Sequence, residues 1–348
     1  MIVSALQKLV SGISLTQEEA ALVMTIIMDG QATDAQIGAL LASLRTKRET
    51  VDELTGCARV MRDRSIKVHS RRRPLLDTCG TGGDGADTFN ISTTAAFIIS
   101  AAGIPVAKHG NRAVSSRCGS ADVLAALGVE LALTPEQIGQ SIDTVGIGFM
   151  YAPSHHPATA YASRARKEMG IRTMFNALGP LTNPAGANRQ LIGVFDPDLC
   201  EKVAETLNRF GCERAMVVHG MDGLDEISTV GPTKIAHLQH GRVSVETRIP
   251  AEFYVVPATI EDFKGGDSPA ENADIVLSVL NGELGPRRDI VSVNAAAGLI
   301  LGGMAESFRD GIQLAHRLID NKKALAVLHK LVQFTGQFAR EPEQEPAT

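Results

Sequence analysis

One glycine-rich segment, Asp77-Thr78-Cys79-Gly80-Thr81-Gly82-Gly83-Asp84-Gly85, constrains the fold more than any other part of the chain, because four glycines fall within six positions. The apolar run Pro74-Leu75-Leu76 before it predicts a strand, and residues 92–100 after it predict a helix. A strand, a glycine loop and a helix start together present backbone N–H groups and a positive dipole end to an anion, usually a phosphate. The loop is neither a Walker A motif nor a GxGxxG fingerprint, so a tight turn without a ligand remains the alternative.

In this 348-residue chain, the spacing of apolar residues changes near residue 74. Before it, apolar positions recur at helical spacing, and Thr16-Gln17-Glu18-Glu19 and Thr33-Asp34-Ala35-Gln36 have the form of helix starts. After it, strand and helix patterns alternate, which predicts an α/β fold with a mainly parallel central sheet flanked by helices. We expect a small all-helical domain over residues 1–70, joined by a helical segment near 165–185, a large α/β domain over residues 74–340, and a flexible tail over residues 341–348.

Three loops of the α/β part follow predicted strands, so all three can meet at the carboxyl edge of the sheet, where ligands bind in such folds. These loops are residues 79–92, 108–120 and 219–228. The strands are expected at 74–76, 104–107, 148–151, 190–195 and 215–218, with an antiparallel pattern over 235–257. Helices are expected at 198–210, 270–280, 291–301 and 307–334.

Two polar clusters in these loops suit an anion. Asn90-Ile91-Ser92-Thr93 offers an amide, two hydroxyls and the N–H groups of a first helical turn, although Ser92 or Thr93 could be simply an N-cap. Lys108-His109-Gly110-Asn111-Arg112-Ala113-Val114-Ser115-Ser116 combines two cations, an amide and two hydroxyls, which predicts a polyanion clamp, and Ser120 could add a donor. We assign His109 no proton-transfer role, because a lone histidine is more often structural.

A third cluster, Asp225-Glu226, lies in a glycine-containing loop. Adjacent carboxylates there suit Mg²⁺, which prefers oxygen ligands and keeps substrate phosphates in its shell. Ordinary loop acidity is the alternative, but beside two phosphate-binding loops the metal is the better account. His155-His156-Pro157 has no HExxH or cysteine partner, so we interpret it as helix capping and packing rather than as a transition-metal site.

Composition limits the partners and the compartment. A formal net charge of -5, from 34 basic and 39 acidic residues, argues against nucleic acid or an anionic membrane as a partner. The longest weakly polar stretch, residues 95–107, contains Ser100, Gly103 and Pro105 and falls short of a membrane span, and the N-terminus has no secretory signal. Five scattered cysteines without a CxxC suggest reduced thiols, so we expect a cytoplasmic protein.

In this order, the motifs closely resemble those of the anthranilate phosphoribosyltransferase family over nearly the whole chain. The resemblance rests on the glycine loop, on Asn90-Ile91-Ser92-Thr93 and on the segment from Lys108 to Ser116. It continues through Phe175-Asn176-Ala177-Leu178-Gly179-Pro180-Leu181-Thr182-Asn183-Pro184 and Gly223-Leu224-Asp225-Glu226-Ile227-Ser228. The family transfers the 5-phosphoribosyl group from phosphoribosyl pyrophosphate to the amine of anthranilate, with release of pyrophosphate, in tryptophan biosynthesis.

The resemblance also implies roles for individual residues and a homodimer formed through the helical part. Magnesium, with two ions per subunit, would be held by Ser92, Asp225 and Glu226, and Lys108 would join the two carboxylates as an electrostatic stabiliser. Anthranilate would contact Gly80, Asn111 and Arg166, although composition alone places Arg166 on a solvated helix face. Phosphoribosyl pyrophosphate would be bound by Gly80, Gly82, Gly83, Asp84, Thr88, Asn90, Ile91, Ser92, Thr93, Lys108, His109, Gly110, Asn111, Arg112, Ala113, Val114, Ser115, Ser116 and Ser120.

Two other functions compete with this interpretation. A pyrimidine nucleoside phosphorylase would have a related architecture, but Asn111 and the Asp225-Glu226 pair speak against it. A non-catalytic relative that binds nucleic acid would need a basic surface and an eroded carboxylate pair, whereas this chain is acidic and keeps both carboxylates.

Overall fold

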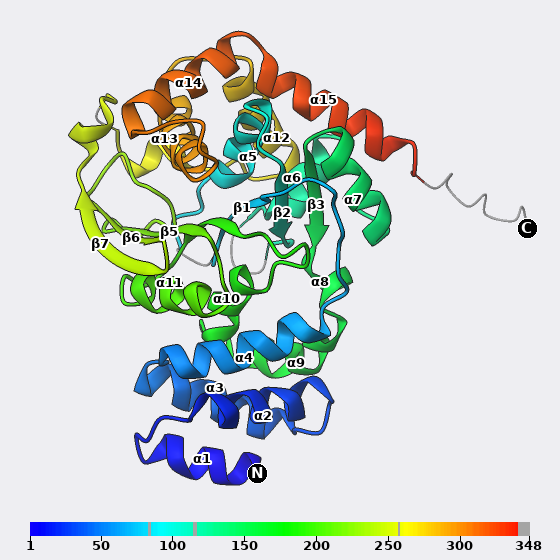
Figure 1. Ribbon diagram of the computed structural model, residues 1–348, viewed down its shortest axis with the longest axis vertical. Coiled ribbons are helices and arrows are strands. Elements are labelled where there is room, and N and C mark those ends of the chain that lie inside the picture. The colour runs from blue at the N-terminus through cyan, green and yellow to red at the C-terminus, as the bar shows by residue number, and fades with distance from the viewer. Residues whose placement is uncertain (83–84, 114–116, 257, 340–348) are drawn as a thin grey trace, which may run out of the picture.

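The computed structural model describes residues 1–82, 85–113, 117–256 and 258–339, which form a helical body and an α/β body (Figure 1). The helical body contains the N-terminus, and the α/β body surrounds a seven-stranded sheet. The predicted fold class, a small helical part on a large α/β part with a mainly parallel sheet, is confirmed. Among the described residues, no helix is both long enough and apolar enough to cross a membrane.

Capping boxes start three of the four N-terminal helices. In each box a threonine hydroxyl accepts an N–H of the first turn while a Glu or Gln three residues later accepts the threonine N–H, which satisfies two donors that a helix start leaves open. At Thr16 the two bonds, with Glu19, are 3.2 and 3.0 Å long, which confirms the predicted start. The same box is formed at Thr33 and Thr50. The helices are α1 (Ile2–Val10), α2 (Gln17–Met28), α3 (Asp34–Lys47) and α4 (Val51–Arg64).

A later part of the chain completes the helical body. After β3 the chain forms α8 (Ala152–His155), α9 (Ala160–Met169) and α10 (Met174–Leu178) before it returns to the sheet. Helix α9 packs on α2 and α3, and α10 packs on α3 and α4. Buried side chains of α1–α4, α9 and α10 share one apolar core with α11, so the two bodies meet through a continuous packed layer.

The sheet has the strand order β3-β2-β1-β4-β5-β6-β7, in which β1 to β5 are parallel and β6 and β7 are antiparallel to their neighbours. Helix α5 packs with α12–α15 on one side, and α11 packs on the other (Figure 1). The strands are β1 (Leu76–Gly80), β2 (Val106–Gly110), β3 (Ile147–Tyr151), β4 (Arg189–Gly193), β5 (Arg214–Gly220), β6 (Thr233–Gln239) and β7 (Arg242–Arg248). The remaining helices are α5 (Ile91–Ala101), α6 (Ser120–Ala126), α7 (Pro135–Thr144), α11 (Leu199–Arg209), α12 (Pro269–Leu280), α13 (Pro286–Leu301), α14 (Phe308–Asp320) and α15 (Lys323–Gly336), with short 3₁₀ turns η1 (Pro157–Thr159), η2 (Pro180–Thr182), η3 (Pro250–Phe253) and η4 (Ile260–Phe263).

The expected bounds of several elements are wrong. The helix expected at 291–301 begins five residues earlier, at Pro286. Strands β1 and β2 begin two residues later than predicted and continue to Gly80 and Gly110, so the first residues of two predicted loops are strand residues. Polar side chains suggested a loop there, but Asp77 and Lys108 are buried and hydrogen-bonded within the sheet. The single helix expected at 307–334 is two helices, because Lys322 adopts a left-handed conformation with φ 58° between them.

Candidate active site

A cavity of about 340 Å³ lies between the carboxyl ends of β1 and β2, the start of α5 and the helices α4, α9 and α10. Every candidate site residue that the structure describes lines it. These are Gly80, Gly82, Thr88, Asn90, Ile91, Ser92, Thr93, Lys108, His109, Gly110, Asn111, Arg112, Ala113, Ser120, Arg166, Asp225 and Glu226. The candidates Gly83, Asp84, Val114, Ser115 and Ser116 lie outside the described residues.

The cavity has two walls of different origin. The strand wall consists of residues at or near the ends of β1 and β2, at the start of α5, and in the loop between β5 and β6. These are Gly80, Thr81, Gly82, residues 90–93, Lys108, Asp225 and Glu226. The helix wall consists of residues from α4 and from the segment between β3 and β4, namely Met61, His156, Arg166, Phe175 and Asn176.

In the strand wall, Gly80 and Gly82 of the glycine loop lie against the Asp225 carboxylate. The Gly82 N–H donates to Asp225 Oδ2 over 2.8 Å, and a Cβ atom on Gly80 would collide with that same oxygen. Glycine is therefore required at position 80 because the carboxylate approaches the backbone closely. The Asp225 main chain in turn crosses the end of β4, where a Cβ atom on Gly193 would collide with it.

The first turn of α5 holds the second carboxylate. Helix α5 begins at Ile91, so Ser92 and Thr93 lie inside the first turn, and neither is the N-cap that the alternative interpretation required. The Ser92 N–H donates to Glu226 Oε1 over 3.1 Å, as expected where open N–H groups and the helix dipole favour an anion. This bond brings Glu226, Asp225 and the glycine loop to one side of the cavity.

Lys108 is a buried cation in the strand wall. It is 2% exposed, and its Nζ donates to the Thr78 carbonyl over 2.6 Å. Asp77, also buried, accepts the His109 N–H over 3.1 Å and the Asn183 side-chain amide over 2.8 Å. Burial lowers the pKa of Lys108, and the Asp77 and Glu226 carboxylates oppose that change. Burial raises the pKa of Asp77, and Lys108 together with these two hydrogen bonds opposes that change. Asp77 thus lies beside a buried lysine that lines the cavity.

Two buried histidines meet where the walls join. The rings of His109 and His156 lie 5.2 Å apart between centroids. Burial, together with His156, lowers the pKa of His109 to about 3, and burial lowers the pKa of His156 to about 4. Both imidazoles are therefore neutral near pH 7. Their Nε2 atoms are buried and have no hydrogen-bond partner among the described residues, which leaves them available to a polar ligand group.

The described residues between β2 and α6, which lie on either side of positions 114–116, are tied to one another and to α6. The Arg112 guanidinium pairs with Asp122 over 3.0 Å, so part of the expected cationic clamp is neutralised within the loop. Ser120 Oγ donates to the Asn111 carbonyl over 3.3 Å, and a Cβ atom on Gly110 would collide with that hydroxyl.

Arg166 gives the helix wall its charge. Its guanidinium lies 4.9 Å from the ring centroid of Phe175, and the side chain is half-buried, so the solvated helix face suggested by composition is wrong. Burial lowers the pKa of Arg166, and no described acidic side chain forms an ion pair with it. By contrast, the exposed Arg164 on the same helix pairs with Glu168 and Asp34. Arg166 is thus prepared to take an anion from the cavity.

Several cavity residues escaped analysis of the sequence. The His155-His156-Pro157 run is a signal for His156, but helix capping and packing account for the run without placing His156 in the cavity that it lines. Phe175 and Asn176 stand in a motif that supported the resemblance without a role of their own. Thr81 and Met61 gave no signal, because nothing near Met61 in sequence marks one position of α4 as facing the cavity.

The donor set fits a hard divalent cation. Asp225, Glu226 and the Ser92 hydroxyl offer oxygen ligands at one edge of the cavity. Within the described ranges, no group of three or more His, Cys, Asp and Glu side chains could hold a metal ion. Two carboxylates and a hydroxyl suit Mg²⁺, which completes its shell with water and substrate phosphates rather than with a full set of protein ligands.

Two family models match the chain. The model for the helical bundle domain of a glycosyl transferase family matches residues 3–65, and the model for the a/b domain of that family matches residues 72–325. Together they cover both bodies of the structure.

Individual relatives are similar over almost their whole length. The anthranilate phosphoribosyltransferase of Pelotomaculum thermopropionicum is 52% identical over 339 residues, which cover 97% of this chain and 98% of the relative. The crystal structure of anthranilate phosphoribosyltransferase from Thermus thermophilus superposes with a TM-score of 0.89 at 40% identity and covers 95% of this chain and 99% of its own. The enzyme from Saccharomyces cerevisiae, solved in complex with PRPP and Mg, has a TM-score of 0.87 at 26% identity over 97% of this chain and 98% of its own.

Proposed function

This chain belongs to the anthranilate phosphoribosyltransferase family, and from that premise we propose that the cavity between its strand and helix walls is the active site. The enzyme transfers the 5-phosphoribosyl group from phosphoribosyl pyrophosphate to the amine of anthranilate in tryptophan biosynthesis, and releases pyrophosphate. It binds magnesium as part of this activity.

One observation supports this assignment most strongly. The cavity joins anion-binding backbone and a carboxylate pair on one wall to a half-buried arginine with no acidic partner among the described residues on the other. The first wall suits a polyphosphate with its metal, and the second suits the carboxylate of an aromatic acid. Both substrates of the transfer therefore find complementary groups in one cavity.

On the strand wall, the work of the protein is to stabilise a departing diphosphate. Pyrophosphate leaves C1 of the ribose as the amine attacks from the opposite face, and negative charge gathers on the leaving oxygens. The Lys108 ammonium keeps donors beyond the one given to Thr78, and its burial strengthens its attraction for those oxygens. Magnesium, held by Asp225, Glu226 and Ser92, would neutralise part of the same charge.

On the helix wall, the work is to orient the amine. Arg166 would pair with the anthranilate carboxylate in the two-pronged geometry of a guanidinium, with Phe175 fixing its plane. The aromatic amine is already neutral at physiological pH, so no strong base is required. The low pKa values of His109 and His156 make both imidazoles weak bases, which is consistent with such a reaction. Holding the amine in line with C1 supplies much of the remaining acceleration.

The finer predictions concern the metal, the assembly and the compartment. We propose that each subunit binds two magnesium ions, because two carboxylates line one edge of the cavity. A homodimer through the helical body is supported by exposed apolar side chains along α1 and after it, at Val3, Val10 and Ile13. The scattered cysteines continue to favour the cytoplasm.

The test is the loss of anthranilate fluorescence in the presence of phosphoribosyl pyrophosphate, with and without Mg²⁺. We expect magnesium-dependent turnover in the wild type, and a fall in kcat of about 10³-fold or more when Asp225→Asn is combined with Glu226→Gln. Glu201→Gln, which removes an exposed carboxylate of α11 paired with Lys234, is the matched control and should keep full turnover. Unchanged turnover of the double variant at saturating substrate would refute the metal role.

A further inference from the structure

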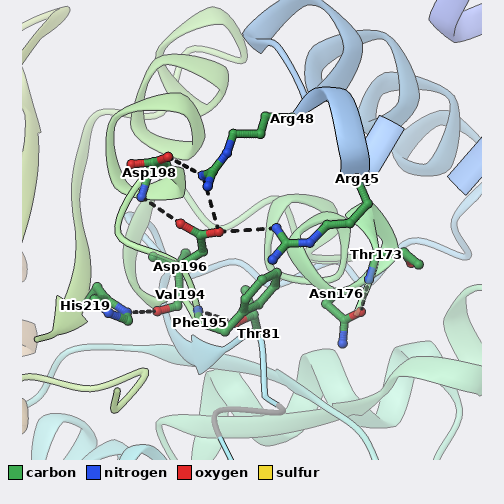
Figure 2. Close-up of polar contacts among 10 residues, drawn as sticks. All are labelled: Arg45, Arg48, Thr81, Thr173, Asn176, Val194, Phe195, Asp196, Asp198 and His219. Atoms are coloured by element: carbon green, nitrogen blue, oxygen red, sulfur yellow. Dashed lines mark hydrogen bonds and ion pairs between the residues drawn. The ribbon is translucent and has the colours of Figure 1, made fainter. Parts of the chain in front are cut away.

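An ion pair joins the helical body to the turn that follows β4. At the end of α3, Arg45 Nη1 lies 3.2 Å from Asp196 Oδ2, and Arg48 Nη1 lies 3.8 Å from the same oxygen (Figure 2). The Asp196 side chain is 16% exposed, and its other oxygen accepts the Asp198 N–H over 3.1 Å. The carboxylate is thereby fixed from three directions.

The neighbouring Phe195 links this ion pair to the glycine loop. The Phe195 N–H donates to Thr81 Oγ1 over 3.1 Å (Figure 2). The Thr81 N–H donates to the Gly193 carbonyl over 2.9 Å. The guanidinium carbon of Arg45 also lies 5.3 Å from the Phe195 ring centroid, so Arg45 contacts two consecutive residues of the turn. Thr81 is thus held on both its N–H and its hydroxyl by the end of β4.

Thr81 directly precedes the loop residue that holds a proposed metal ligand. The Gly82 N–H donates to Asp225 Oδ2, so a shift of Thr81 changes the distance between the loop and that carboxylate. A continuous path of contacts therefore runs from Arg45 on the helical body through Asp196, Phe195 and Thr81 to the strand wall.

We propose that Arg45 and Asp196 are positioning residues for the transfer: their ion pair fixes the Phe195–Thr81 hydrogen bond and so sets the glycine loop for phosphoribosyl pyrophosphate according to the position of the helical body. This inference rests on the proposed function of the cavity. A partly exposed ion pair contributes little to the free energy of folding, so we expect this pair to affect the position of Thr81 more than the stability of the protein. A loop displaced by about 1 Å can lose a large part of its effect on a reaction.

The molecule offers a matched control for this path. Arg209 at the end of α11 pairs with Asp52 at the start of α4 over 2.5 Å, which also joins the two bodies. Arg209 is about as exposed as Arg45, at 42% against 35%, whereas Asp52 is more exposed than Asp196, at 53% against 16%. Neither Arg209 nor Asp52 contacts the turn after β4 or the glycine loop in the bonds that the structure describes. A variant that lacks the Arg209–Asp52 pair therefore loses an ion pair between the two bodies but keeps the hydrogen bonds of Thr81.

The experiment compares Arg45→Met with Arg209→Met in the full-length enzyme. We expect Arg45→Met to raise the KM for phosphoribosyl pyrophosphate by about fivefold or more, the usual range of coupling between linked sites, with the KM for anthranilate and the melting temperature close to wild type. The amide hydrogens of Thr81 and Gly82 should exchange faster with solvent in Arg45→Met and not in Arg209→Met. Arg45→Lys, which keeps the charge, should recover most of the affinity.

The outcomes separate the two claims. Equal effects of the two methionine variants on KM and on exchange, or unchanged values in both, would overturn the positioning role. If the wild type fails to bind phosphoribosyl pyrophosphate in a calorimetric titration, the proposed function is wrong. The difference in amide hydrogen exchange between Arg45→Met and Arg209→Met then still decides whether Arg45 holds the loop.

Discussion

The two walls of the cavity are built on different principles. The strand wall is made largely by backbone, with N–H groups of Gly82 and Ser92 that hold the oxygens of Asp225 and Glu226 at the ends of parallel strands and the start of a helix. The helix wall is made by side chains from several segments that are distant in the sequence, such as Met61 from α4 and Arg166 from α9.

This difference suggests that the two walls have different roles in the reaction. At Gly80 the strand wall leaves no room for an added atom, because the backbone and the Asp225 carboxylate are already in contact. Such a wall suits a charge that must be held without rearrangement. A side-chain wall can be altered one group at a time, so it suits the choice of acceptor. Substitutions in the strand wall should therefore reduce turnover, whereas those in the helix wall should reduce affinity for one substrate.

Among the single substitutions that compare the two walls, the largest effect is expected at Gly80. In Gly80→Ala the new methyl group displaces the Asp225 carboxylate, so kcat should fall about 10²-fold while the free energy of unfolding changes little. Steady-state kinetics with both substrates saturating, together with urea unfolding, measures the two quantities.

Gly82→Ala separates steric displacement from backbone strain. Gly82 has φ +65°, but a Cβ atom there would meet no atom of the described residues within 4 Å, so this variant should lose about 1 kcal/mol of stability with a smaller loss of kcat. If Gly80→Ala and Gly82→Ala behave alike, displacement of Asp225 is not the cause.

The helix wall should respond through affinity. Arg166→Met removes the charged partner proposed for the anthranilate carboxylate, so kcat/KM for anthranilate should fall by about 10- to 100-fold, the worth of a hydrogen bond to a charged group. The KM for phosphoribosyl pyrophosphate should stay near that of the wild type. Aniline lacks the carboxylate, so its inhibition constant in competition assays should be the same in Arg166→Met as in the wild type.

Arg164→Met is the control on the same helix, since Arg164 is exposed and paired with Glu168 outside the cavity. An equal loss in both variants would point to damage to α9 rather than to a lost carboxylate contact.

The smallest effect concerns the histidines at the junction of the walls. Burial lowers the pKa of His156 from 6.5 to about 4, so above pH 6.5 the imidazole is neutral in both states and its contribution to stability is fully present. As the pH falls from 6.5 towards 4, the unfolded chain takes up the proton first, and stability should fall by up to about 1.4 kcal/mol per pH unit for this one group.

Unfolding free energies at several pH values should therefore show a shallower slope below pH 6.5 in His156→Gln than in the wild type. Identical slopes would mean that His156 does not stay neutral in the folded protein.

Much of the strand wall could be predicted from the sequence, because its signals are local. Glycines, hydroxyls and cations fall within short runs, and the parallel-sheet pattern brings the ends of different strands to one edge. The strand bounds were the weak point: Asp77 and Lys108 looked like loop residues, and only their burial and hydrogen bonds show that β1 and β2 include them.

The helix wall was harder to predict because its residues are distant in sequence and individually ordinary. A methionine on α4 and a histidine before η1 acquire meaning only when the helices pack. Arg166 was identified through the resemblance, whereas its composition and spacing favoured solvent. The link from Arg45 to Thr81 depends on side chains far apart in the sequence and had no linear pattern to reveal it.

The excursion of the chain from β3 into the helical body before its return at β4 governs how the protein can be made. Helices α1–α4 leave the ribosome first, yet the partners α9 and α10 that cover them are synthesised only after three strands of the sheet. A nascent chain that stops before residue 160 exposes the apolar faces of α2 and α3 that α9 would bury. Neither body is an uninterrupted stretch of sequence, so neither can be transplanted into another protein as a single cassette.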